Sequence, residues 1–319
     1  MTYYELLEGY KVKKIILIII LSLILIPIVI YFIFPEILYI FSISSIRKAS
    51  GLSEKVINVD DYSIHYLEGG KGETILLIHG FDANKDNWSR FAKFLTKKYH
   101  VVAIDLPGFG ESSKIETDSY NIASQTKRLN TIVKALGLKK FHIAGNSMGG
   151  AIVGKYSVNY PDKVLSLALV NTAGIYSAET SEVMKLVEKG ENPLLSKTPE
   201  DFKELIKFVF VKPPLIPGRI LDYLTKEAII NRDFNEKIFA QLSDEKYSLE
   251  NDLSKIKANT ITIWGDKDRV LHVSCTDVIR RELPDSTIVI LENCGHAPML
   301  EKPKETAEHY LKFLNSIKK

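Results

Sequence analysis

The chain has few of the residues that mark several common classes of protein. Its 319 residues include only two cysteines, Cys275 and Cys294. This number excludes a disulfide framework, and the spacing does not fit a zinc site. We predict two free thiols, with a single bridge between them as the open alternative. The net charge is only +3 and the lysines are scattered, so nucleic acid is not predicted as a partner.

The chain does contain one long hydrophobic run. Residues 15–34 carry no charge, and only Ser22 and Pro27 interrupt the apolar side chains. About 20 helical residues cross a hydrocarbon core of about 30 Å. A cleaved signal peptide is the alternative, but its apolar region spans about 7 to 15 residues and ends at a small-residue site. We therefore predict a tail over 1–14 and an uncleaved transmembrane helix over 15–34.

A juxtamembrane segment over residues 35–54 is predicted to follow the anchor. Its apolar stretch, 37–46, suits a helix that lies along the membrane surface. Three lysines between residues 11 and 14 precede the anchor closely, whereas Arg47 and Lys48 follow it at a greater distance. The positive-inside rule therefore favours, by a narrow margin, a soluble domain on the extracytoplasmic side. No feature of the sequence predicts an oligomeric state.

Residues 55–319 alternate between strand and helix patterns, which is typical of an α/β protein with a mostly parallel sheet and helices on both faces. An alternating pair, 56–59 and 62–66, predicts an N-terminal β-hairpin. Short apolar runs at about 74–79, 101–105, 141–145, 164–170, 260–264 and 286–291 predict buried strands. The alternation stops at about 174–259, where the pattern is mostly helical. We interpret this stretch as a helical lid inserted between two strands.

A candidate nucleophile lies between two glycines. Gly145-Asn-Ser-Met-Gly149 follows a predicted strand and precedes a predicted helix. This context is the one that a nucleophile elbow requires, because glycine permits the tight turn and the close approach of neighbouring backbone. The elbow would hold Ser147 beside a helix N-terminus, which favours developing negative charge.

A serine hydroxyl needs a base, and the base needs an acid that fixes its tautomer. His296 lies in a loop after the last predicted strand and is our candidate base, with His272 as its strongest competitor. The loop after the preceding strand offers Asp266 and Asp268, and we choose Asp268 because it lies further into the loop. The chain order is then serine, aspartate, histidine, as an α/β-hydrolase requires.

Acyl transfer also needs amide donors for the oxyanion. Met148 follows the nucleophile, and Phe81 follows His79-Gly80 after an early strand, so we predict these two backbone amides. His79 is expected to support the loop and not to act as a base. This chemistry needs no metal or organic cofactor, and none is predicted.

Several motifs together resemble the α/β-hydrolase superfamily over roughly residues 55–317. In chain order they are His79-Gly-Phe, Asp105-Leu-Pro-Gly-Phe-Gly, Gly145-Asn-Ser-Met-Gly-Gly, Trp264-Gly-Asp-Lys-Asp and Gly295-His-Ala-Pro. With the anchor, the chain is most similar to membrane-anchored lipases and esterases of the monoacylglycerol lipase type. The resemblance implies hydrolysis of lipid esters such as monoacylglycerols.

Other functions remain as alternatives. A carbon–carbon bond or amide hydrolase could use the same triad, and a non-enzymatic scaffold on this fold is a weaker alternative because no triad member is missing. In the predicted lid, an apolar stripe is expected to pack onto the domain, with contact to an acyl chain as the alternative. The stripe consists of Phe202, Leu205, Ile206, Val209 and Phe210.

Overall fold

A single sheet organises the soluble part of the chain. The structure is a computed structural model that describes residues 3–245 and 247–317. Its sheet has eight strands in the order β1-β2-β4-β3-β5-β6-β7-β8. The strands are β1 (Leu52–Val59), β2 (Tyr62–Gly69), β3 (Thr74–Ile78), β4 (His100–Ile104), β5 (Phe141–Ser147), β6 (Val164–Thr172), β7 (Asn259–Gly265) and β8 (Thr287–Leu291). The predicted N-terminal hairpin is β1 with β2, which pair antiparallel, and β2 is also antiparallel to β4. All pairs from β4 to β8 are parallel.

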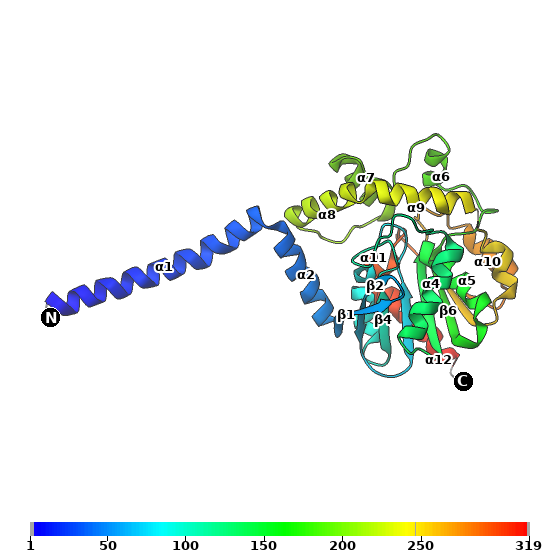
Figure 1. The fold of residues 1–319 in the computed structure, drawn as a ribbon, viewed down its shortest axis with the longest axis horizontal. Helices are drawn as coiled ribbons and strands as arrows, with labels where there is room; N and C mark the ends of the chain where they lie inside the picture. Colours follow the sequence, from blue (N-terminus) through cyan, green and yellow to red (C-terminus); the bar gives the residue numbers. More distant parts are fainter. Residues whose placement is uncertain (1–2, 246, 318–319) are drawn as a thin grey trace.

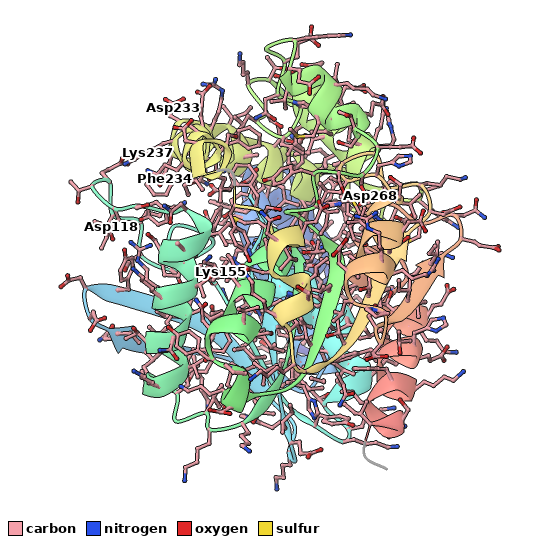
Figure 2. The ribbon with its side chains drawn as sticks, turned by 90° about the vertical axis from the view of Figure 1, so that its right-hand side faces the viewer. Asp118, Lys155, Asp233, Phe234, Lys237 and Asp268 are labelled. Carbon is pink, nitrogen blue, oxygen red and sulfur yellow. The ribbon has the colours of Figure 1, made fainter. Side chains whose placement is uncertain are left out.

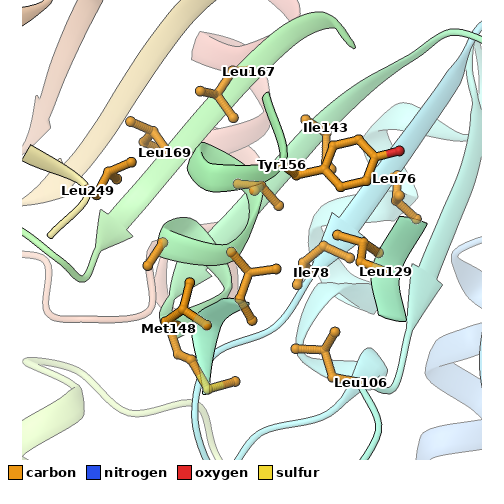
Figure 3. Close-up of a cluster of buried hydrophobic side chains, with 14 of the residues drawn as sticks. Leu76, Ile78, Leu106, Leu129, Ile143, Met148, Tyr156, Leu167, Leu169 and Leu249 are labelled. Carbon is orange, nitrogen blue, oxygen red and sulfur yellow. The ribbon is translucent and has the colours of Figure 1, made fainter. Parts of the chain in front are cut away.

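Helices cover both faces of the sheet, which confirms the predicted fold class. Their bounds are α3 (Ser89–Leu95), α4 (Ile122–Ala135), α5 (Met148–Asn159), α10 (Cys275–Glu282), α11 (Pro298–Glu301) and α12 (Pro303–Ser316), with 3-10 turns η1 (Lys85–Trp88) and η2 (Pro161–Lys163). Helices α4, α5 and α10 enclose one hydrophobic core against the sheet, and part of this core is drawn in Figure 3. Helices α3, α11 and α12 enclose a second core on the opposite face.

The central strands are buried on both faces, as their continuous apolar sequences predict. In β3, the side chains of Ile75, Leu76, Leu77 and Ile78 have no exposed surface. Leu76 and Ile78 belong to the first core, whereas Ile75 and Leu77 belong to the second. Because a strand alternates its side chains between faces, a run without polar residues joins both cores to one rigid sheet.

An insertion of helices separates β6 from β7. It contains α6 (Glu182–Val187), α7 (Pro199–Val209), α8 (Gly218–Ile230), α9 (Arg232–Glu245) and the 3-10 turn η3 (Glu250–Lys255). Figure 1 shows α6 to α9 grouped together beyond one end of the sheet. The break in the strand–helix alternation thus corresponds to a separate layer of helices next to the strand ends.

Two helices precede the sheet. Helix α1 (Tyr3–Ile33) projects away from the rest of the molecule, and its stretch Leu7–Ile33 is long and apolar enough to cross a membrane. Helix α2 (Pro35–Ala49) follows after Phe34 and contacts α3, α8 and β1. The stretch that the sequence assigned to the membrane surface therefore also has a face that packs on the soluble domain.

Candidate active site

Ser147 is held in a strained turn between β5 and α5. Its backbone has φ 55° and ψ −121°, a conformation that side chains other than glycine rarely adopt. The turn depends on its two glycines. A Cβ atom on Gly145 would lie 2.3 Å from the Gly149 carbonyl oxygen, and one on Gly149 would lie 2.3 Å from the His79 carbonyl oxygen. Glycine is therefore needed at both positions for the strand, the turn and the neighbouring loop to pack together.

His296 and Asp268 form a buried pair at the same end of the sheet. His296 Nδ1 and Asp268 Oδ2 are 2.8 Å apart, and both residues are less than 10% exposed. The backbone amides of Val270 and Leu271 donate to Asp268 Oδ1 at 2.8 and 3.0 Å. These bonds fix the orientation of the carboxylate, so Oδ2 can accept a hydrogen bond from the N–H group at Nδ1 of His296, which leaves Nε2 to accept a proton.

The competing residues lie elsewhere. Asp266 Oδ1 accepts from the backbone amide of Cys294 at 3.2 Å, so it holds the loop that precedes His296. His272 Nδ1 lies 2.9 Å from the Ser274 hydroxyl at the start of α10. The structure thus brings Asp268, and not Asp266, to the imidazole of His296.

Asn171 lies next to the His296–Asp268 pair, and the sequence did not indicate this contact. Its side-chain amide donates to Asp268 Oδ2 at 2.6 Å, and its side chain has no exposed surface. Its φ of 43° places it in the left-handed region, which asparagine tolerates better than most residues. Asn171 thus shares the carboxylate oxygen that His296 uses.

The loop after β3 lies against Ser147. A Cβ atom on Gly80 would lie 3.0 Å from the Cβ atom of Ser147. Buried His79 fixes this loop, because its Nδ1 lies 2.7 Å from the Gly80 carbonyl oxygen and its Nε2 accepts from the Leu106 amide at 3.0 Å. Burial lowers the pKa of His79, so its imidazole is neutral and suited to this pair of bonds. Phe81, the expected amide donor, comes next in the chain.

Ser147 and His296 line one cavity of about 350 Å³, which lies within the range of small-molecule sites, about 300–1,000 Å³. Much of its wall is apolar and comes from α7 and α2. Helix α7 contributes Phe202, Leu205, Ile206 and Val209, and Phe210 follows, so the apolar stripe of the insertion lines the site. Helix α2 contributes Tyr39, Ile43 and Ile46, none of which the sequence placed here.

A cluster of charged side chains attaches α2 beside this cavity. We call it the Lys85 cluster, and it consists of Lys85, Arg47, Glu54, Asp86, Asp105 and Glu111. The Lys85 ammonium lies 2.9 Å from Asp105 Oδ2 and 3.1 Å from Glu54 Oε1, and it also bonds Glu111. Arg47, in the last turn of α2, bonds Asp86.

The described residues offer one group with metal-ligand chemistry. Glu54, His65 and Glu111 bring a ligand atom each within 4.8 Å of one another. Lys85 and Arg47 both lie within ion-pair distance of these two carboxylates, so two cations of the protein already compensate their charge. The two cysteines are free, and burial raises the pKa of each thiol to about 12, so neither is suited to act as a nucleophile. The expectation that no cofactor is required stays a prediction.

Comparison with known proteins identifies the family of the chain. The sequence model of the alpha/beta hydrolase fold matches residues 73–303. The chain belongs to the α/β-hydrolase fold family.

The relatives of the chain specify the class of enzyme more closely. Monoacylglycerol lipase ABHD6 of Mus musculus is 36% identical over 285 residues, which cover 85% of each chain. Lipase 1 of Psychrobacter immobilis is 39% identical over 252 residues, which cover 78% of this chain and 79% of that one. A crystal structure described as a membrane phospholipase A, a bacterial virulence factor, superimposes with a TM-score of 0.88 at 47% identity and covers 96% of this chain and 99% of that one. These relatives confirm the predicted enzyme class, a lipase-like ester hydrolase.

Proposed function

We propose that the chain is a membrane-anchored serine esterase that cleaves lipid esters, monoacylglycerols among them, with Ser147, His296 and Asp268 as its triad. The observation that carries this proposal is the His296–Asp268 hydrogen bond of 2.8 Å beside the strained turn that holds Ser147. The names of the relatives support the substrate class, because they include a monoacylglycerol lipase and a lipase.

The proposed reaction is acyl transfer to water. Ser147 Oγ attacks the ester carbonyl while His296 Nε2 takes its proton, and Asp268 stabilises the imidazolium through Nδ1. The backbone amides of Phe81 and Met148 donate to the oxyanion, and the second of these begins helix α5. His296 then protonates the leaving alcohol, and water repeats the sequence on the acyl-enzyme.

Ser147→Ala tests the nucleophile. Because the hydroxyl carries the covalent step, we expect turnover to fall by about 10³-fold or more. The wild-type protein should also be treated with a fluorophosphonate probe and the adduct located by peptide mass spectrometry, followed by a p-nitrophenyl ester series of increasing chain length. Labelling at Ser147 with a preference for medium or long chains supports the proposal. Undiminished ester hydrolysis in Ser147→Ala would contradict it.

The anchor is part of the same proposal. Residues 15–34 are proposed to span the membrane, with residues 1–14 as a cytoplasmic tail and the hydrolase domain, residues 55–319, on the extracytoplasmic side. The charge distribution around the apolar run supports this orientation. In sealed vesicles with the cytoplasmic face outward, added protease should leave the domain intact until detergent opens the vesicles. Digestion of the domain before detergent is added would show the opposite orientation.

A further inference from the structure

A second cavity adjoins the one that contains Ser147. Its volume is about 550 Å³, and it lies among α2, α8, α9 and the loops after β3 and β4. The two cavities share part of their walls, including Tyr39, Asp82 and Leu224. In contrast to the apolar cavity, the second has many charged and amide side chains in its wall. An ester placed at Ser147 therefore has an apolar space and a polar space next to it.

Asp82 lies on the boundary between the two cavities, one residue after Phe81. It lines both, and its φ of 50° turns the chain sharply at this point. The side chain is accessible, although burial within the protein raises the pKa of its carboxyl to about 7. An accessible side chain and a pKa raised by burial are compatible if the accessible surface of Asp82 faces the two cavities and not the outside of the molecule.

The Asp82 carboxylate has capacity for further hydrogen bonds. Asn235 of α9 donates to Asp82 Oδ1 at 2.6 Å. A carboxylate offers about four acceptor positions on two oxygens. The other charged groups in the wall of the polar cavity are Lys114, Glu36, Glu227 and the Lys85 cluster, and Lys114 is close enough to lower the pKa of Asp82. Lys85 and Arg47 already bond the carboxylates of their cluster, whereas Asp82, at the boundary of the two cavities, still offers acceptor positions that suit a hydroxyl group of a ligand.

We infer that the polar cavity binds the alcohol part of the lipid ester and that Asp82 accepts a hydrogen bond from a free hydroxyl group on it. This inference rests on the proposed esterase function of Ser147. The acyl chain then occupies the cavity that α2 and α7 line with apolar side chains, and the alcohol part faces Asp82. The substrate class is an ester of a polyol, such as glycerol, with at least one hydroxyl left unesterified.

Two esters with the same acyl chain test the inference. A 1-monoacylglycerol and the corresponding propyl ester differ only by the two hydroxyls of the alcohol part. The quantity to measure is the ratio of kcat/KM for the monoacylglycerol to kcat/KM for the propyl ester, which we call the hydroxyl preference. It should be about 10 or more for the wild type at pH 8.5, because a hydrogen bond to a charged group contributes about 1.5–3 kcal/mol.

Two variants of Asp82 distinguish an effect on recognition of the substrate hydroxyl from an effect on folding. Asp82→Ala should lower the hydroxyl preference about 10-fold. Asp82→Asn should lower it by a smaller factor, because its amide oxygen can still accept from Asn235. The matched control is Asp233→Asn on α9, where Figure 2 labels the aspartate at the margin of the molecule and 91% of the side chain is exposed. This control should keep the wild-type preference.

The pH dependence adds a readout that a purely structural role would not change. Both esters are cleaved by the same triad, so effects of pH on the triad cancel from the ratio. The wild-type hydroxyl preference should rise between pH 6 and pH 8.5 as Asp82 ionises, whereas that of Asp82→Asn should stay flat. An unchanged preference in Asp82→Ala, or equal losses on both esters, would overturn the inference. Failure of the esterase proposal itself would be seen separately, as absence of fluorophosphonate labelling at Ser147.

Discussion

Replacing Arg47 by alanine should loosen helix α2 from the catalytic domain. The Arg47 guanidinium donates from Nε and Nη2 to the two oxygens of Asp86, at 2.7 and 2.6 Å, and from Nη1 to Glu54 Oε2 at 2.6 Å. The arginine side chain is 13% exposed and that of Asp86 is 7% exposed. Arg47→Ala would thus leave a nearly buried carboxylate without its bidentate partner.

The size of the effect follows from this burial. Removal of one partner from a fully buried ion pair costs about 3–5 kcal/mol, whereas an exposed pair contributes about 0–1 kcal/mol. Since water reaches part of Arg47 and the remaining Lys85 cluster can partly neutralise Asp86, we expect Arg47→Ala to lower the free energy of unfolding by about 2–4 kcal/mol. Activity on long-chain esters should fall as well, because α2 forms part of the cavity wall.

The assay is denaturant unfolding of the detergent-solubilised protein, with Lys48→Ala as the control. Lys48 is the next residue of α2 and is exposed. A double-mutant cycle with Asp86→Ala should give a coupling of about 1.5 kcal/mol or more for the Arg47–Asp86 pair. Surface substitutions usually change the free energy of unfolding by no more than about 0.5 kcal/mol. If the free energies of unfolding of Arg47→Ala and Lys48→Ala differ by less than this amount, the reasoning is refuted.

Three further predictions concern the site. Asn171→Asp would place a second carboxylate next to Asp268, so one carboxyl of the pair should keep its proton at neutral pH, and kcat/KM at pH 7 should fall about 10-fold and recover as the pH rises; a pH profile unchanged from the wild type would contradict this. Because the pKa of Asp82 is raised from 3.8 to about 7 in the folded protein, the folded state binds more protons between these values and loses stability as the pH rises through them. Asp82→Asn should therefore be more stable than the wild type at pH 8, by about 1–2 kcal/mol after discounting for solvent in the cavity, and equal to it below about pH 4, as thermal unfolding at both pH values would show. Leu205→Trp should fill the apolar cavity and lower kcat/KM for long-chain p-nitrophenyl esters about 10-fold relative to the acetate, and an unchanged chain-length profile would show that the acyl chain lies elsewhere.

The sequence predicts the parts of the site that depend on local structure. Five residues are enough to recognise the elbow around Ser147. Its glycines at 145 and 149 are required by backbone contacts within the turn and with the end of the neighbouring strand β3. Asp268 and His296 each follow a strand of a parallel sheet, and the carboxyl ends of such strands meet at one edge. Their approach to one another could therefore be expected from strand order alone.

The parts that the sequence did not predict depend on contacts between distant segments. The contact of Asn171 with the acid was not predicted, because its bond to Asp268 joins residues 97 positions apart. Helix α2 was assigned to the membrane surface, since its apolar side chains suit lipid as well as a cavity wall. The Arg47–Asp86 bond, which turns one face of α2 toward the site, spans 39 positions and has no local signature.

The place of α2 between α1 and the site bears on how a lipid would reach Ser147. Only Phe34 separates α1 from α2, so the beginning of α2 lies at the membrane boundary if α1 spans the bilayer. At about 1.5 Å per residue, Tyr39 lies about 6 Å and Ile46 about 17 Å along α2 from Pro35. Both line the cavity that contains Ser147. A lipid that left the bilayer at the end of α1 would therefore meet the cavity wall about one helical turn along α2, at Tyr39, and this wall extends to Ile46, about three turns along the helix.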